Sequence, residues 1–178
     1  MRLLQYNDGD ISLTTFFTDK IPQKYAILSH IWGAEEVTFE DLQKRTCGEK
    51  AGYKKIRFCG EQALRDGLQY FWVDTCCIDK SSNAELTEAI NSMFRWYRES
   101  TKCYVYLSDV SRSAVDSNNL GWEVVFRKSK RFTRGWTLQE LITLASVEFF
   151  TKEWELFGNK VSLEVHIYEI TEIPAKAL

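Results

Sequence analysis

The chain has 178 residues, the size of one ordinary domain, and 44% of them are hydrophobic, which is enough to bury a sizeable core. Its formal net charge is −2, so the composition gives no electrostatic reason to expect nucleic acid or an anionic membrane surface as a partner. No run approaches the ~20 apolar residues of a membrane span, and the N-terminus meets a charged turn at Asn7-Asp8 too soon for a signal peptide. We therefore expect a single cytosolic domain over residues 1–178.

The cysteines predict neither disulfides nor a metal site. Their number is odd, two of them are adjacent, and no CxxC spacing occurs. They are Cys47, Cys59, Cys76, Cys77 and Cys103. We expect buried, reduced thiols and no bound metal. A catalytic thiol at the adjacent pair is the weaker interpretation, because no histidine stands at a recognisable spacing from it.

The first half of the chain alternates strands with helices. Tyr25–Ser29 is an apolar run that predicts a buried strand, and His30–Gly33 follows as a glycine loop. Thr38–Asp41 has the pattern of a capping box at a helix start. Tyr53–Asp66 predicts a helix closed by Gly67. The apolar face expected for this helix holds Tyr53, Ile56, Ala63 and Leu64.

Tyr70–Val73 is apolar at every position and predicts a strand covered on both faces. Asp74–Lys80 follows as a loop at the carboxyl end of that strand. Ser82 and Glu85 form a second capping box, which begins the clearest helix of the chain. The apolar face expected for this helix holds Leu86, Ala89, Ile90, Met93, Phe94 and Tyr97.

The second half continues the alternation. Cys103–Leu107 predicts a strand, followed by a polar connection from Ser108 to about Lys130. Thr137–Leu144 predicts a short helix and Val147–Phe150 a further strand. Gly158-Asn159 is typical of a hairpin turn. The spacing of Leu163, Ile167 and Ile170 predicts a final helix.

This alternation predicts an α/β fold with a mainly parallel central sheet flanked by helices. An extra hairpin and helix are expected at the C-terminal end. In such folds, ligands bind beside the carboxyl ends of the strands. The segments of interest are therefore 30–33, 74–79 and the one that leads into Glu140.

Three segments, in order, resemble the signature blocks of the heterokaryon incompatibility domain family of filamentous fungi. They are Tyr25–Gly33, Trp72–Lys80 with its continuation through Met93, and Arg131–Leu141, which contains the family's string from arginine–glycine–tryptophan to glutamate–leucine. Together they lie within residues 25–150. The resemblance implies a domain that triggers cell death when incompatible cells fuse.

The family is also distantly similar to the TIR domain, which implies a flavodoxin-like fold. Ile27–Gly33 resembles the first TIR strand with its loop, and Phe71–Asp79 resembles the second strand with its terminal aspartate. Trp136–Leu141 resembles the motif that carries the catalytic glutamate of NAD-cleaving TIR enzymes. Ile31 and Trp32 stand where the TIR loop usually has a basic residue, so this chain departs from the TIR pattern at the position of a phosphate clamp.

The TIR resemblance implies that Glu140 is the catalytic residue. A carboxylate beside the ribose stabilises the oxocarbenium-like state through which the nicotinamide–ribose bond breaks, without a metal or a resident cofactor. Trp136, one helical turn earlier, is a stacking partner on the same face. The alternative is structural: Thr137–Glu140 also fits a capping box, in which Glu140 satisfies a backbone donor.

Further residues are candidates for binding NAD+ or a related nucleotide as the substrate. They are Ser29, His30, Trp32, Gly33, Asp74 and Asp79, in addition to Trp136. The histidine would contact a diphosphate, the aspartates ribose hydroxyls, and the tryptophan with its glycine a base. Each has a structural alternative: a hydrogen-bonded histidine, aspartates that cap turns, and a tryptophan packed in the core.

Two functions are compatible with this fold. One is an NAD+-hydrolysing cell-death effector that becomes active by homotypic self-assembly. The other is a non-enzymatic signalling module that works by assembly alone. A nucleotide sensor that binds without cleaving is a third, weaker interpretation.

Overall fold

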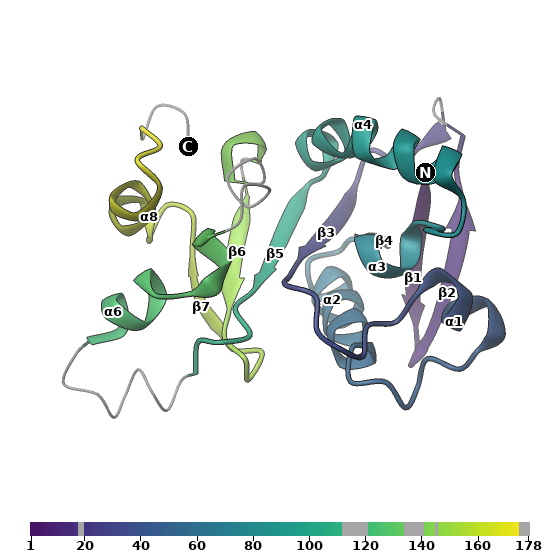
Figure 1. Cartoon of the computed structure of the whole chain (residues 1–178), viewed down its shortest axis with the longest axis horizontal. Helices are drawn as coiled ribbons and strands as arrows, with labels where there is room; N and C mark the ends of the chain where they lie inside the picture. Colours follow the sequence, from purple (N-terminus) through teal and green to yellow (C-terminus); the bar gives the residue numbers. More distant parts are fainter. Residues whose placement is uncertain (18–19, 112–120, 134–140, 145, 175–178) are drawn as a thin grey trace. The chain divides into compact units, whose positions relative to one another are not determined.

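A computed structural model describes residues 1–17, 20–111, 121–133, 141–144 and 146–174 (Figure 1). The chain divides into two compact units. The first consists of Met1–Leu28 with Trp32–Thr101, and the second of Ser29–Ile31 with Lys102–Leu178. The expectation of one domain over residues 1–178 stays a prediction. Within the described residues, no helix is long and apolar enough to cross a membrane.

The sheet of the first unit has the strand order β2-β1-β4-β3. These strands are β1 (Arg2–Asn7), β2 (Asp10–Thr15), β3 (Tyr25–Ser29) and β4 (Tyr70–Val73). β3 and β4 are parallel, as expected, whereas β1 runs antiparallel to both β2 and β4. The β1–β2 hairpin, purple in Figure 1, was not predicted from the sequence.

Helices cover both faces of β4 because consecutive strand residues point to opposite sides. Phe71 faces α2 (Tyr53–Arg65), where a Cβ added to Gly60 would lie 3.1 Å from its ring. Trp72 points the other way and meets two aromatic rings of α4 (Asn83–Glu99) at 5.7 and 6.1 Å. A strand without a polar position is therefore buried on both sides, as predicted.

Two helix starts fulfil the capping predictions to different degrees. α1 (Phe39–Lys44) begins with a complete capping box between Thr38 and Asp41. At the start of α4, the Ser82 hydroxyl accepts from the backbone N–H of Glu85, 3.4 Å away. The second half of that box is missing, because the Glu85 carboxylate instead accepts from the backbone N–H of Asp79 and pairs with Arg2.

Three expectations for the helices of this unit were wrong. Residues 74–80 are not a continuous loop, because Asp74–Cys77 forms a one-turn helix, α3. Leu64 of α2 is 60% exposed, although the helix and its closing Gly67 lie where predicted. On α4, Ile90 and Phe94 are each 46% exposed, so only part of the predicted apolar face is buried.

The second unit contains β5 (Lys102–Tyr106), β6 (Val147–Phe150) and β7 (Leu156–Asn159) in that order across its sheet. β5 and β6 are parallel and β6 and β7 antiparallel, so the expected C-terminal hairpin is present. The predicted position of the hairpin turn was wrong, however, because Gly158 and Asn159 belong to strand β7. The final helix, α8 (Glu164–Thr171), follows as expected.

The connection predicted from Ser108 to Lys130 is partly helical. It contains α6 (Gly121–Arg127), and a short 3-10 helix occupies Lys130–Thr133. Aromatic packing accounts for this helix, because Phe126 of α6 is fully buried. The centroid of its ring lies 5.6 Å from that of Phe149 and 5.5 Å from that of Phe157. Of the helix predicted over 137–144, residues 141–143 are helical and 137–140 lie outside the described residues.

The fold is therefore α/β, as predicted. The described strand pairings are mixed, so the expectation of a mainly parallel sheet is not confirmed.

Candidate functional site

The parallel pairing of β3 and β4 brings two predicted site residues together in the first unit. Leu28 lies beside Val73 in register, so the segments after these strands leave the sheet at the same edge. There, the indole N–H of Trp32 donates a hydrogen bond to Asp74 Oδ2, 2.8 Å away. Trp32 is 49% exposed, so the alternative that it packs into the core is wrong.

Lys80 is the third member of this cluster and lies over the face of the indole ring. Its Nζ lies 3.5 Å from the Trp32 ring centroid, a cation–π contact. Burial lowers the pKa of Lys80, and the negative charges of Asp74 and Glu36 offset part of that effect. Within the described part of the chain, no carboxylate lies within ion-pair distance of Lys80. We call Trp32, Asp74 and Lys80 the Trp32 cluster.

A hollow of about 480 Å³ adjoins the Trp32 cluster, and Lys80 belongs to both. This volume is within the range of small-molecule sites. The hollow lies between α1 and the segment that begins with α3, and is lined by Thr38, Phe39, Glu40, Gln43, Thr75, Ile78, Asp79, Lys80 and Ser81. Thr75 is 2% exposed, and its hydroxyl has no hydrogen-bond partner in the structure.

Asp79 lines the hollow, but its carboxylate is already engaged. Oδ1 accepts from the backbone N–H of Ser81 at 3.0 Å and from the Ser81 hydroxyl at 2.6 Å. These two bonds lower the pKa of Asp79. The turn-capping alternative therefore holds for Oδ1.

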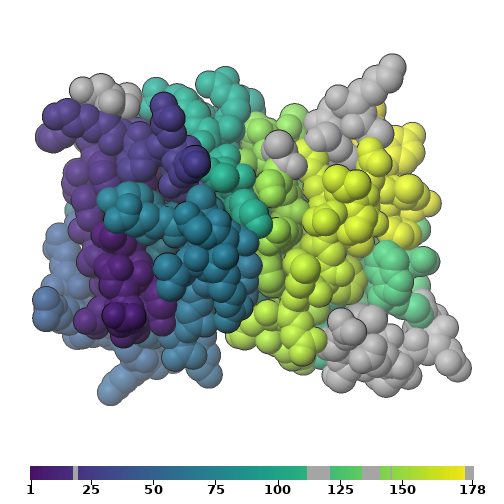
Figure 2. Space-filling view, turned by 180° about the vertical axis from the view of Figure 1, so that it is seen from behind, coloured from purple at the N-terminus to yellow at the C-terminus, as the bar shows by residue number. Residues whose placement is uncertain are grey.

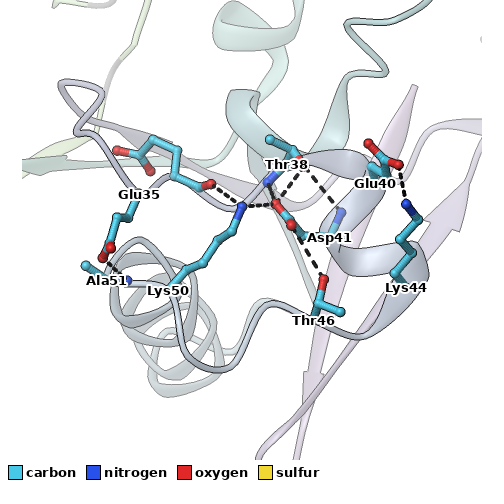
Figure 3. A network of polar contacts seen from close by, with 9 residues as sticks. Glu35, Thr38, Glu40, Asp41, Lys44, Thr46, Lys50 and Ala51 are labelled. Atoms are coloured by element: carbon cyan, nitrogen blue, oxygen red, sulfur yellow. Dashed lines mark hydrogen bonds and ion pairs between the residues drawn. The ribbon is translucent and has the colours of Figure 1, made fainter.

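The wall formed by α1 has a saturated polar network, shown in Figure 3. The Asp41 carboxylate accepts from Thr38 through both the backbone N–H and the hydroxyl, at 2.8 and 2.7 Å, and from Lys50 Nζ at 2.6 Å. Thr46 Oγ1 donates to its other oxygen at 3.5 Å. The hydrogen bonds from Lys50 and Thr38 lower the pKa of Asp41 to about 2.

Gly33 has a local structural role in the same segment. Its backbone N–H donates to Glu36 Oε1 at 2.6 Å, and the same oxygen pairs with Lys55. This pairing neutralises Glu36, one of the acidic side chains whose charge acts on Lys80.

Ser29 and His30 belong to the second unit. Ser29 is buried, and its hydroxyl accepts a hydrogen bond of 2.7 Å from Arg131 Nη2. Arg131 is itself only 1% exposed. A buried guanidinium needs hydrogen-bonding partners, so this contact gives Ser29 a structural role. His30 is half-buried.

Trp136 and Glu140 lie outside the described residues. The hypothesis that His30, Asp79, Trp136 and Glu140 surround one concave site therefore stays a prediction, as does the catalytic role of Glu140.

The cysteines are reduced, as predicted, and four of the five are buried. Burial raises the pKa of Cys76 well above its ordinary value, which disfavours the thiolate that a nucleophile requires. No group of three or more metal-binding side chains occurs among the residues that the structure describes.

Sequence reasoning missed Lys80, Thr75 and Arg131. Lys80 and Thr75 lie within the segment Trp72–Lys80. The signal available for them was their position shortly after a predicted strand. Their place beside the hollow depends on tertiary packing, which no local sequence pattern reveals. Arg131 opens the third block, but its partner Ser29 is 102 residues earlier.

Trp32 and Asp74 lie beside the carboxyl ends of two parallel strands, the place where α/β folds generally bind their ligands. Comparison with known proteins is more specific. The model of the family "Heterokaryon incompatibility protein (HET)" matches residues 25–124, and the chain belongs to this family. The predicted membership is confirmed.

The chain is also similar to vegetative incompatibility protein HET-E-1 of Podospora anserina, with 56% identity over 183 aligned residues. That alignment covers 100% of this chain and 13% of the relative, so the chain corresponds to a small part of the longer protein. No solved structure matches the chain significantly.

Proposed function

We propose that this chain is the cell-death effector domain of a fungal non-self recognition protein, acting in the cytoplasm. Family membership supports this role, as does the 56% identity to a protein named for vegetative incompatibility. We further propose a TIR-like site that hydrolyses NAD+ when copies of the domain assemble.

The observation that carries the proposal is the Trp32 cluster. A ring that is half exposed is available to stack on a nucleotide base, and the bond to Asp74 fixes the plane of that ring. The adjoining hollow offers an ammonium, hydroxyls and two carboxylates at the sheet edge where α/β folds bind nucleotides. A dinucleotide has complementary parts: flat bases, ribose hydroxyls and phosphates.

Glu140 is the proposed catalytic residue. As the nicotinamide–ribose bond breaks, positive charge develops on the ribose ring, and a nearby carboxylate stabilises it. The same carboxylate orients the water that attacks the ribose, so the products are nicotinamide and ADP-ribose. This proposal rests on the similarity of residues 136–141 to the TIR motif.

The test is the isosteric substitution Glu140→Gln. It retains the size of the side chain and can still accept a hydrogen bond, but it removes the negative charge. If Glu140 is catalytic, NAD+ consumption by the purified domain at high concentration should fall by at least about 100-fold, the usual effect of losing such a group. Thermal unfolding should change little. A variant that folds and retains wild-type turnover contradicts the assignment.

The non-enzymatic module remains the second candidate, and one surface favours it. Val161, Val165 and Tyr168 recur at helical spacing along the α8 region and are 81, 64 and 52% exposed. Figure 2, which views the molecule from behind, draws this C-terminal region in yellow. Exposed apolar side chains of this kind commonly mark association surfaces. Wild-type protein that forms oligomers in light scattering yet never consumes NAD+ favours this second function.

A further inference from the structure

The N-terminal hairpin of the first unit leaves one edge of its sheet uncovered. β2 is the end strand of the sheet, and among the described elements only β1 packs along its length (Figure 1). Asp8 and Gly9 join the two strands with positive φ angles, as in a tight two-residue turn, and the pairing continues without a bulge to Thr15. One side of a regular strand is therefore open to a further strand.

The backbone groups on this open side belong to Ile11, Leu13 and Thr15. The backbone N–H of Phe16 donates to the carbonyl oxygen of Met1 at 2.8 Å, so the even-numbered residues of the strand bond to β1. In an antiparallel pair, the residues between these point their N–H and C=O groups away from the neighbouring strand. Each of the odd-numbered residues thus presents one donor and one acceptor to the open side.

β2 also lacks the features that commonly keep sheet edges from pairing. Exposed edge strands usually carry lysine or proline, or are interrupted by a bulge. β2 contains neither lysine nor proline, and its only charged residue is Asp10 at one end. The end strand β7 of the second unit is different: its pairing with β6 is irregular at Phe149 and Phe150, and Lys160 follows it directly. The open side of β2 therefore has the character of a binding edge.

We propose that β2 pairs with β2 of a second copy of this chain, antiparallel and centred on Leu13, so that the sheet continues from one copy into the next. A twofold axis relates the copies, as in most homodimers. This register sets Leu13 opposite itself and Ile11 opposite Thr15 of the second copy. Every outward backbone group of the strand then has a partner, whereas a shift of two residues pairs only part of them within β2.

The side chains of β2 are self-complementary in this register. Leu13 meets its own copy, and Ile11 meets the β-branched Thr15 on the same face of the sheet. On the other face, Ser12 lies opposite Thr14, so that hydroxyl groups can bond across the strands. Pairs of these kinds are the ones that stabilise antiparallel strands.

The ends of the strand also argue for a second copy as the occupant. Asp10 would lie opposite Phe16 of the second copy, so no like charges meet, and no oppositely charged partner is required. Phe17 is 74% exposed and would lie opposite Gly9, around which there is open space for a ring. A ring over a glycine in a neighbouring strand is a known stabilising arrangement.

The expected association is weak and reversible, because one pair of short strands buries less area than a standard interface. The inference deepens the proposed function, on which its biological meaning rests: it supplies a surface for the assembly that activates the domain. A weak contact of this kind makes assembly depend on local concentration.

The experiment is sedimentation equilibrium of the whole 178-residue chain over a range of concentrations. We expect a monomer–dimer equilibrium. Leu13→Lys should weaken dimerisation at least about tenfold, because an ammonium of each copy then faces its twin. Leu64→Lys is the matched control, since it makes the same replacement at an exposed position of α2 and should dimerise like the wild type. A wild-type chain that stays monomeric at about 1 mM overturns the proposal.

A crosslink tests the register and remains informative if Leu13→Lys folds poorly. Residues directly opposite in a hydrogen-bonded antiparallel pair have Cα atoms about 5.5 Å apart, within the span of a disulfide. Oxidised Leu13→Cys should therefore form a covalent dimer on a non-reducing gel. Ser12→Cys should crosslink no more than the wild type, whose own Cys47 is partly exposed. Equal crosslinking of Leu13→Cys and Ser12→Cys contradicts the register.

A further variant distinguishes this edge from the apolar surface of α8. Val165→Lys should leave dimerisation unchanged, although Val165 is 64% exposed. Dimers that are lost in Val165→Lys but persist in Leu13→Lys overturn the proposal. Failure of the proposed function looks different: dimers that depend on Leu13 but consume no NAD+ at any concentration would support the edge and reject the hydrolase.

Discussion

The two walls of the hollow differ in how far their polar groups are satisfied. On the α1 wall, the Asp41 carboxylate accepts hydrogen bonds from Thr38, Thr46 and Lys50 (Figure 3). On the facing wall, the Thr75 hydroxyl is buried without a hydrogen-bond partner, and the half-buried Lys80 ammonium contacts the face of the Trp32 ring. Groups whose hydrogen bonds are made contribute to folding, whereas a group left unmatched contributes little to it. Substitutions on the α1 wall should therefore lower stability more than substitutions of Thr75 or Lys80.

The largest effect on stability is expected from Gly52→Ala, at the start of α2 and beside the segment that leads into α1. A Cβ at Gly52 would lie 2.7 Å from the carbonyl oxygen of Glu35 and 2.9 Å from the Cα of Glu36. Backbone atoms cannot move away cheaply, so the free energy of unfolding should fall by about 1–3 kcal/mol. Urea denaturation measures the change. Gly48→Ala is the matched control, since its Cβ meets nothing within 4 Å and should have little effect.

Asp41→Ala should have the next largest effect. It removes the acceptor for Thr38 and Lys50 and dissolves the capping box, so we expect a loss of about 1 kcal/mol in the free energy of unfolding. Lys80→Met should lower the free energy of unfolding much less. A loss of stability in Lys80→Met as large as that in Asp41→Ala would end the distinction between the two walls.

Acid should remove the same contribution gradually. The pKa of Asp41 is about 2 in the folded protein and 3.8 ordinarily, so its charge stabilises the fold above pH 4. This stabilisation is lost as the pH falls from about 4 to about 2. The difference in urea midpoint between the wild type and Asp41→Asn should therefore narrow over that interval. A difference that stays constant would show that the charge of Asp41 is not involved.

The smallest effect is expected from Lys44→Met. Lys44 pairs with Glu40 on the exposed surface of α1, where water and salt screen the attraction. Neither the urea midpoint nor its salt dependence should move beyond the scatter of replicate curves. A clear loss of stability would show that the exposed pair of Lys44 and Glu40 also stabilises the fold.

Local patterns predicted the elements whose cause is local. Tyr25–Ser29 and Tyr70–Val73 are strands with the predicted bounds because unbroken apolar runs require cover on both faces. The box at Thr38 formed because both partners lie within one helical turn. Where a distant group competes, the same pattern failed. Glu85 is drawn to Arg2, 83 residues earlier, and so leaves the box at Ser82 incomplete.

The candidate site was predictable to a similar extent. The position after parallel strands made both Trp32 and Asp74 candidates, and the structure shows a hydrogen bond between these two side chains. The positions of Thr75 and Lys80 in the hollow could not be read in this way, because they depend on tertiary packing between α1 and the segment that begins with α3. The exposure of Ile90 and Phe94 was also unpredictable, since helical spacing shows which residues share a face but not whether that face is covered.

The hydrogen bond between Arg131 and Ser29 limits how the chain can be dissected. Ser29–Ile31 belongs to the second unit although the sequence on either side belongs to the first. A fragment that starts at Lys102 would contain Arg131 but would lack the hydroxyl that its guanidinium contacts at 2.7 Å. The two units are therefore not modular in sequence: neither expression as separate polypeptides nor exchange between relatives at a single crossover can transfer the second unit whole.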